Sequence, residues 1–398
     1  MAREMDRRTW LAHSLGAAAA LGTGMVPAGL TAAPAAPQAA DRSRDAPSTP
    51  VGIQRCESFE PQLLRRRLDA VLDLIGGIKK LVENKTVTIK INLTGLEWKP
   101  LGGMPAYETY QTHPNTVAAL AAALADAGAR RIVVVENLYW DKPFETVLRE
   151  ADWDVAAIGA AGSHRVGFED TRHRGPWPGY SRFKVPWGGF IFPAFDLNQR
   201  FEKTDVLVSL AKLKQHACAG VTGAVKNFFG ITPCSLYGND APSENPKDHR
   251  TATFHDGRKR VPEGVPAELP NDAPREGRYR VPRIVADVFG ARPAELNLID
   301  GMRTIRGGEG WWNRGVAAVE PKLLLAGRNG VCTDAVATAV MGFDPQAPHG
   351  KPPFQGDNHL RLLASVGVGT NDLKRIEIAG LPLKDAVYPF QPARRARS

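Results

Sequence analysis

The pattern of apolar and polar residues predicts strands and helices that alternate along the chain. Residues 86–92 alternate with the period of two typical of a strand, and residues 131–136 form the continuous apolar run of a buried strand. The Ala-rich segment 117–127 between them predicts a helix, which Thr112 would cap, Pro114 would begin and Gly128 would end. A strand, a helix and a strand within about fifty residues predict a βαβ crossover and hence a parallel sheet.

The same pattern extends over the rest of the chain. An apolar stripe predicts a helix over residues 62–75, and further strands are expected at residues 205–210, 295–300, 322–326 and 374–378. A helix over residues 333–341 ends at Gly342. Residues 160–200 predict an irregular or hairpin insertion, and residues 236–281 predict a long Pro-rich, charged loop. We therefore expect an α/β fold, a mostly parallel open sheet with flanking helices and long loop insertions, in one domain over residues 56–398.

The N-terminus has the pattern of an export signal. Arg7 and Arg8 are followed by Thr9, Trp10 and Leu11, and an apolar Ala-rich run with small-residue cleavage positions comes next. We predict a twin-arginine signal over residues 1–40 and a flexible linker over residues 41–55, with an ordinary secretory signal or an uncleaved anchor as alternatives. The expected location is periplasmic or extracellular, the translocase is the expected partner during export, and the run is too short to span a bilayer stably.

Composition narrows the possible partners and cofactors. The formal net charge of +9 is spread along the chain without a basic block interleaved with aromatics, which disfavours nucleic-acid binding and favours anionic ligands. The four cysteines, Cys56, Cys218, Cys234 and Cys332, form no C-x-x-C pair, so we expect no iron–sulfur cluster and no zinc ribbon. Cys218 and Cys234 could form a disulfide or remain small buried thiols.

The most informative segment is residues 212–230, KLKQHACAGVTGAVKNFFG, which follows a predicted strand. Cations beside glycines at a strand end are typical of a site for a small anion. His216 and Lys226 are the candidates for proton transfer, because histidine titrates near neutrality and a desolvated lysine can do so. Residues that could hold a carboxylate or phosphate are Lys212, Lys214, Thr222 and Asn227, together with Lys90 and Asn92 on one face of an earlier strand. A solvated basic loop and an exposed strand face are the alternatives.

A second polar segment begins with Asp300 at a strand end and continues through a glycine-rich loop. We predict Asp300 as a third catalytic residue, and Arg303 and Arg306 as substrate-binding residues. Glu309 and Asp334 are candidate ligands for a divalent metal ion. The alternatives are an Asp-Gly turn with an ion-paired loop, and an Asp334 that caps the start of its own helix.

The segment 212–230 resembles the signature of a family known as domain of unknown function 362, whose pattern is close to PKLKTH…GVTGALKNLFG. Supporting matches are Ile89–Asn92, Thr112–Pro114, Ile299–Gly301 and the helix from Thr333 to Gly342, so that the resemblance covers residues 86–344. It implies a fold similar to the N-terminal part of nickel-pincer lactate racemases, which place Lys and His around a cofactor. Some members carry ferredoxin-type cysteine clusters, which this chain lacks, and here Ala211 and Gln215 replace the usual proline and threonine.

These patterns predict an exported enzyme that uses Lys/His acid–base chemistry on a small anionic molecule such as a hydroxy or sugar acid. The reaction could be that of an isomerase, a lyase or a hydrolase, with a divalent metal ion as a possible cofactor. Two alternatives from other classes are a non-catalytic periplasmic binding protein for an anionic metabolite or metal, and a cofactor-bearing redox protein.

Overall fold

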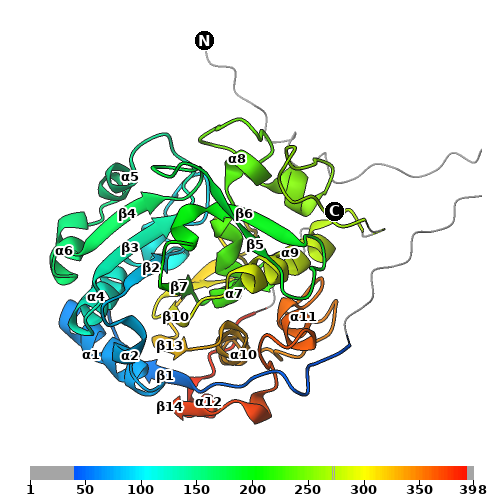
Figure 1. Cartoon of the computed structure of the whole chain (residues 1–398). Helices are drawn as coiled ribbons and strands as arrows, with labels where there is room; N and C mark the ends of the chain where they lie inside the picture. The colour runs from blue at the N-terminus through cyan, green and yellow to red at the C-terminus, as the bar shows by residue number, and fades with distance from the viewer. Residues whose placement is uncertain (1–39, 271, 273, 392–398) are drawn as a thin grey trace, which may run out of the picture. The chain divides into compact units, whose positions relative to one another are not determined.

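The computed structural model describes residues 40–270, 272 and 274–391 (Figure 1). The export signal predicted over residues 1–40 therefore lies, apart from Ala40, outside the described residues. Within the described ranges, none of the helices combines the length and the apolar character needed to cross a bilayer.

An eight-stranded sheet forms the centre of the described chain (Figure 1). Its spatial order is β14 (Ile378–Gly380), β1 (Val51–Arg55), β13 (Leu323–Gly327), β10 (Leu296–Gly301), β7 (Val206–Lys212), β2 (Thr86–Lys90), β3 (Arg131–Glu136) and β4 (Val166–Asp170). Strand β13 is antiparallel to both of its neighbours, and the other adjacent strands are parallel. The prediction of a mostly parallel open sheet with flanking helices is confirmed.

The order of the strands reverses between β2 and β7. From β2 the chain moves outward through β3 to β4, and it then returns to place β7 on the other side of β2 and β10 beyond it. In open parallel sheets such a switch point opens a crevice at the carboxyl ends of the strands, and ligands bind there. The topology therefore indicates the carboxyl ends of β2 and β7 as the place to look for a ligand-binding site.

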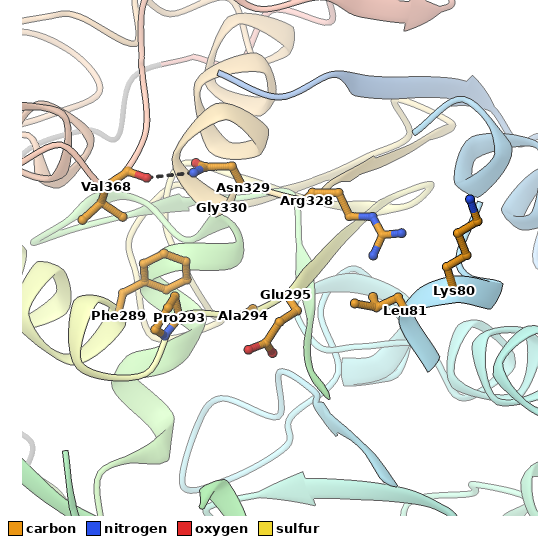
Figure 2. Close-up of a pocket in the computed structure, with 10 residues that line it drawn as sticks. All are labelled: Lys80, Leu81, Phe289, Pro293, Ala294, Glu295, Arg328, Asn329, Gly330 and Val368. Atoms are coloured by element: carbon orange, nitrogen blue, oxygen red, sulfur yellow. Dashed lines mark hydrogen bonds between the residues drawn. The ribbon is translucent and has the colours of Figure 1, made fainter. Parts of the chain in front are cut away.

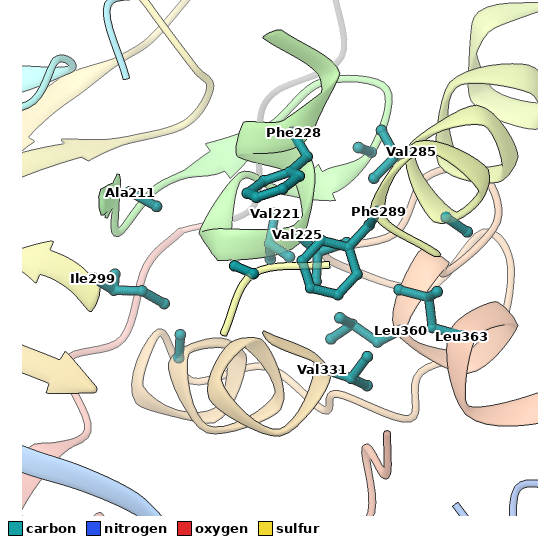
Figure 3. Packing of buried hydrophobic residues seen from close by; sticks show 14 of the residues in the cluster. Ala211, Val221, Val225, Phe228, Val285, Phe289, Ile299, Val331, Leu360 and Leu363 are labelled. Carbon is teal, nitrogen blue, oxygen red and sulfur yellow. The ribbon is translucent and has the colours of Figure 1, made fainter. Parts of the chain in front are cut away.

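Helices cover both faces of the sheet. Strand β3 shows the division, because Ile132 and Val134 join one hydrophobic core and Val133 and Val135 join the other. The first core includes α1 (Pro61–Asp73), α4 (Pro114–Asp126), α5 (Phe144–Glu150) and α6 (Val155–Ala161). The second includes α7 (Gly223–Asn227), α9 (Gly277–Ala291), α10 (Gly330–Val340) and α11 (His359–Ser365), and Figure 3 shows Phe228 of the helical turn after α7 and Phe289 of α9 packed together within it. Four shorter helices are α2 (Lys79–Val82), α3 (Ala106–Thr109), α8 (Cys234–Tyr237) and α12 (Leu383–Ala386).

Several boundaries differ from the sequence-based expectation at the sheet edges. Residues 51–55, which composition assigned to the linker over 41–55, form β1 and pair with β13 and β14. Residues 166–170, within the expected insertion at 160–200, form the edge strand β4, and the hairpin β5 (Tyr180–Lys184) and β6 (Ala194–Asn198) follows. The last strand is residues 378–380 rather than 374–378. Strands β1, β4 and β14 each contain a glycine and few apolar residues, so their periodicity is not distinct.

The long loop predicted at residues 236–281 is packed against the second core. Phe254, in a helical turn at Thr251–His255, is fully buried there, and α9 begins at Gly277, before the predicted end of the loop. The loop thereby carries His255 toward Cys218, beyond the carboxyl end of β7.

Candidate active site

The segment between β7 and α7 forms a compact hairpin at the switch point. Strand β8 (Gln215–His216) pairs with β9 (Gly220–Val221), and α7 begins at Gly223. Gly220 and Gly223 have φ values of +81° and +51°, in the left-handed region that glycine adopts without strain. The hairpin thus places His216, Lys214 and Lys226 beside the end of β2.

Four predicted site residues join one buried network. The Asn227 Oδ1 atom accepts hydrogen bonds from Lys90 Nζ at 3.3 Å and from Asn92 Nδ2 at 3.1 Å. Lys214 Nζ donates to Asn92 Oδ1 at 2.9 Å, and Lys90 Nζ forms an ion pair with Glu136 Oε1 at 2.6 Å. Burial lowers the pKa of Lys90 and lowers that of Lys214 well below its ordinary value. The network holds α7 against β2. Its internal hydrogen bonds and ion pair occupy many of the donor groups that were predicted to bind an anionic ligand.

Glu136 was missed by sequence reasoning, although it carries the counter-charge of this network. It is the last residue of β3 and 4% exposed. Its other oxygen accepts the backbone N–H of Leu93 at 2.7 Å. The available signal was an acidic residue directly after an apolar run, at the same sheet edge as Lys90.

Lys212 and Asp300 form a separate ion pair of 3.0 Å, with both side chains fully buried. Along β7 the even-numbered residues face the core formed with α1 and α4, and the pair accordingly meets Thr116 of α4, whose hydroxyl donates to Asp300 Oδ2 at 3.3 Å. The Lys212 ammonium lies 5.5 Å from the centre of the Phe59 ring. The structure therefore does not bring Asp300 together with His216 and Lys226, because alternation along the strand turns it to the other face.

The Thr112 side chain positions Asn92 of the buried network but does not cap α4. Its hydroxyl accepts the N–H of Asn92 at 2.8 Å, while His113 Nδ1 accepts the N–H of Asn115 at 3.1 Å and caps the helix. Thr112 thus fixes the loop that carries Asn92, and the predicted cap is corrected by one residue.

Lys226 differs from the other lysines of the site because its charge has no direct partner. It is half-buried, its ammonium lies 4.6 Å from the centre of the Phe229 ring, and no hydrogen bond or ion pair reaches Nζ within the described part of the chain. Burial lowers its pKa to about 8, although the Glu309 carboxylate acts in the opposite direction. An amine with this pKa exists in both protonation states near neutral pH.

His216 is held in one orientation beside Lys226. Its Nδ1 atom accepts the backbone N–H groups of Cys218 and Ala219, each at 3.2 Å, so the proton of the neutral ring resides on Nε2. Burial, followed by the positive charge of Lys226, lowers the pKa of His216 well below its ordinary value. The group is therefore a neutral Nε2–H donor at pH 7.

The predicted metal ligands Glu309 and Asp334 both accept hydrogen bonds from backbone N–H groups. Glu309 Oε2 accepts the N–H of Ala217 at 2.9 Å, and Asp334 accepts the N–H groups of Ala224 and Val225 at 2.6 and 2.8 Å. Burial raises the pKa of Asp334 to about 7. Among the described residues, no group of three or more His, Cys, Asp or Glu is arranged to hold a metal ion.

Asp334 anchors α7 rather than its own helix, which Asn329 caps. Its carboxylate occupies the space that a Cβ atom on Gly223 would need, at 2.3–2.4 Å. Asp334 therefore caps a helix, as the alternative interpretation held, but the helix that it caps is α7 and not α10.

The remaining predicted residues lie around this centre. Arg303 forms ion pairs with Glu108 and Glu320, and Arg306 is half-buried at the end of β11 (Thr304–Arg306), which pairs with β12 (Ala317–Val319). The Thr222 hydroxyl is 3.5 Å from the Gln215 carbonyl, within the hairpin. These positions form the rim and the support of the site rather than its centre.

Two histidines that sequence reasoning left out of the site approach it from distant segments, His255 from the helical turn at Thr251–His255 and His359 from the start of α11. His255 lies with Nδ1 4.0 Å from the Sγ atom of Cys218, and His359 is fully buried. Burial lowers the pKa of His255 to about 4 and that of His359 to about 3, and the charge of Lys226 acts in the same direction on both. Cys218 and Cys234 are both free thiols. No local pattern distinguishes these residues, because only folding brings them near Lys226.

The chain belongs to the family described as Domain of unknown function (DUF362), which matches residues 87–339. None of the curated proteins matches it. Among solved structures, a crystal structure of a Thermotoga maritima protein is similar at 12% identity and a TM-score of 0.34, covering 67% of this chain. The match covers 56% of that protein, so the chain spans little more than half of its length. The family confirms the recognition of the central motif and assigns no reaction to it.

Proposed function

We propose that this protein is an exported enzyme that performs proton transfer on a small anionic substrate such as a hydroxy or sugar acid. The observation that carries the proposal is Lys226, a half-buried cation at the switch point with no hydrogen bond or ion pair among the described residues. An unpaired ammonium attracts a carboxylate, and a pKa of about 8 also makes a neutral amine available to accept a proton.

Lys226 and His216 have complementary roles in this proposal. The neutral Nε2–H of His216 donates to a substrate oxygen, because Nδ1 is already occupied by the N–H groups of Cys218 and Ala219. The neutral amine of Lys226 accepts a proton from the substrate carbon next to that oxygen, or from water. The buried network of Lys90, Asn227 and Lys214 keeps α7 in place during the reaction. Asp300 has no direct role, since it pairs with Lys212 on the other face.

Deuterium exchange tests the reaction directly. Purified protein is incubated in D₂O with lactate, malate, glycerate and gluconate, and proton NMR follows the loss of the signal at the carbon that bears the hydroxyl. We expect exchange with at least one acid, and a loss of about 10²–10⁴-fold in Lys226→Ala, the usual magnitude for a general acid or base. His216→Gln should also lose exchange, whereas Lys79→Met, which alters a 73% exposed lysine in α2, should not.

Two outcomes contradict this function. The first is the absence of exchange with every acid, and the second is exchange that survives in Lys226→Ala. Binding of these acids without exchange, unchanged in His216→Gln, favours the non-catalytic binding protein instead. Export is tested separately by replacing Arg7 and Arg8 with lysine and following the protein by cell fractionation, and elemental analysis of the purified protein tests the prediction of a divalent metal ion.

A further inference from the structure

A cavity of ≈ 650 Å³ lies at the opposite edge of the sheet from the candidate active site. It is lined by residues from α2, from the end of α9, from the loop before β10, and from the turn between β13 and α10 (Figure 2). Strand β10 begins beside this cavity at Leu296 and ends at Gly301 beside the active-site edge. At about 3.3 Å per residue, the two edges are roughly 17 Å apart, so the cavity is not an extension of the active site.

The charges around the cavity leave an excess of positive charge. Arg328 is half-buried, and burial lowers its pKa; its Nη2 atom donates to the Gly77 carbonyl at 2.6 Å, and no carboxylate pairs with it among the described residues. Lys80 likewise has no ion pair within the described ranges, whereas its neighbour Lys79 pairs with Glu83. Figure 2 shows Arg328 extended toward the side of the cavity that carries Lys80 and Leu81.

Glu295 is the acidic residue of the lining, but other groups already balance its charge. Its Oε1 atom accepts from Arg292 at 2.8 Å, and its Oε2 atom accepts the N–H of Leu207 at 2.7 Å. The first N–H groups of α10 are also occupied, because the Asn329 side chain caps Val331 and Cys332. The attraction for an anion therefore comes from Arg328 and Lys80, and a guanidinium with one acceptor retains donors for a carboxylate.

The rest of the lining is apolar. Leu81, Phe289, Pro293, Ala294 and Val368 contribute the other walls. Figure 2 shows the Phe289 ring and Pro293 on the side of the view opposite to Lys80. A cavity of this size, with mostly apolar walls and a few polar groups, has the composition of a site for a small organic molecule.

We propose that this cavity is a second binding site, which takes a small organic carboxylate with an apolar body. The carboxylate pairs with Arg328 and Lys80, and the apolar body lies against Phe289, Pro293 and Val368. An inorganic anion lacks the apolar body and would leave these walls in contact with water, so the charge and the walls together define the ligand class.

A titration with 4-phenylbutyrate, followed by saturation-transfer NMR on the ligand, tests this site. We expect saturable binding that weakens about tenfold or more in Arg328→Met and in Lys80→Met, because each removes one charged donor. Lys79→Met is the matched control on the same helix and should bind as the unaltered protein does. Lys80 is exposed, so its replacement is compatible with folding even if Arg328→Met reduces stability.

Two further ligands separate the contribution of charge from that of the apolar body. The neutral analogue 4-phenylbutan-1-ol should bind at least tenfold more weakly, and inorganic phosphate should not compete at equal concentration. The proposal is overturned by the absence of saturable binding, by binding that both variants leave unchanged, or by phosphate that competes as well as the organic acid does.

Discussion

Replacing Lys226 with methionine should stabilise the folded protein at neutral pH. Methionine keeps a similar length and apolar character but removes a charge that the fold has partly taken out of water. The pKa of Lys226 falls from 10.5 to about 8 in the folded state. At about 1.36 kcal/mol per pKa unit this corresponds to roughly 3 kcal/mol, and water that reaches a half-buried amine reduces it, so we expect about 1–3 kcal/mol.

The pH dependence distinguishes this electrostatic cause from a change in packing. Between pH 8 and 10.5 the unfolded chain still binds the proton of this lysine and the folded chain has released it, so the stability contributed by Lys226 rises with pH. The stability difference between Lys226→Met and the unaltered protein should therefore be largest below pH 8 and should close as pH rises toward 10.5. Taking the difference cancels other groups that titrate in the same range.

Urea denaturation followed by tryptophan fluorescence, at pH 7, 8, 9 and 10, gives both free energies of unfolding. Lys79→Met, at an exposed position of α2, is the control and should show no such pH-dependent difference. The interpretation is refuted if Lys226→Met is less stable at pH 7, or if the difference stays constant over the whole pH range.

Three further predictions concern the same region. Acetic anhydride labelling, quantified by mass spectrometry, should modify Lys226 with a midpoint near pH 8, and a midpoint near 10.5 would contradict the lowered pKa. Gly223→Ala should cost about 2–4 kcal/mol in urea denaturation, because the new Cβ would overlap Asp334 and the residue has a positive φ, and an unchanged midpoint would remove the packing argument. Lys212→Met should cost about 3–5 kcal/mol by leaving the buried Asp300 carboxylate without its positive partner, whereas adding Asp300→Asn should recover part of the loss; additive losses would show that the two are not coupled.

The sequence by itself determined the class of fold and the central motif. Period-two strands, a capped Ala-rich helix and continuous apolar runs depend on neighbours within about ten residues, so β2, α4, β3 and β7 could be recognised locally. The association of Lys90, Asn92, Lys214 and Asn227 could also be expected, because each follows or ends a strand and parallel strands end at one edge.

Only the tertiary structure decided which charges pair and which remain unpaired. Lys212 and Lys214 look equivalent in the sequence, yet Lys212 lies buried against Asp300 while Lys214 joins Asn92 in the network. Asp334 lies over a hundred residues from the N–H groups of α7 that it accepts, and no periodicity encodes that contact. Pairing depends on the order and direction of strands that are distant in sequence, and the unpaired state of Lys226 follows from how the surrounding carboxylates are used.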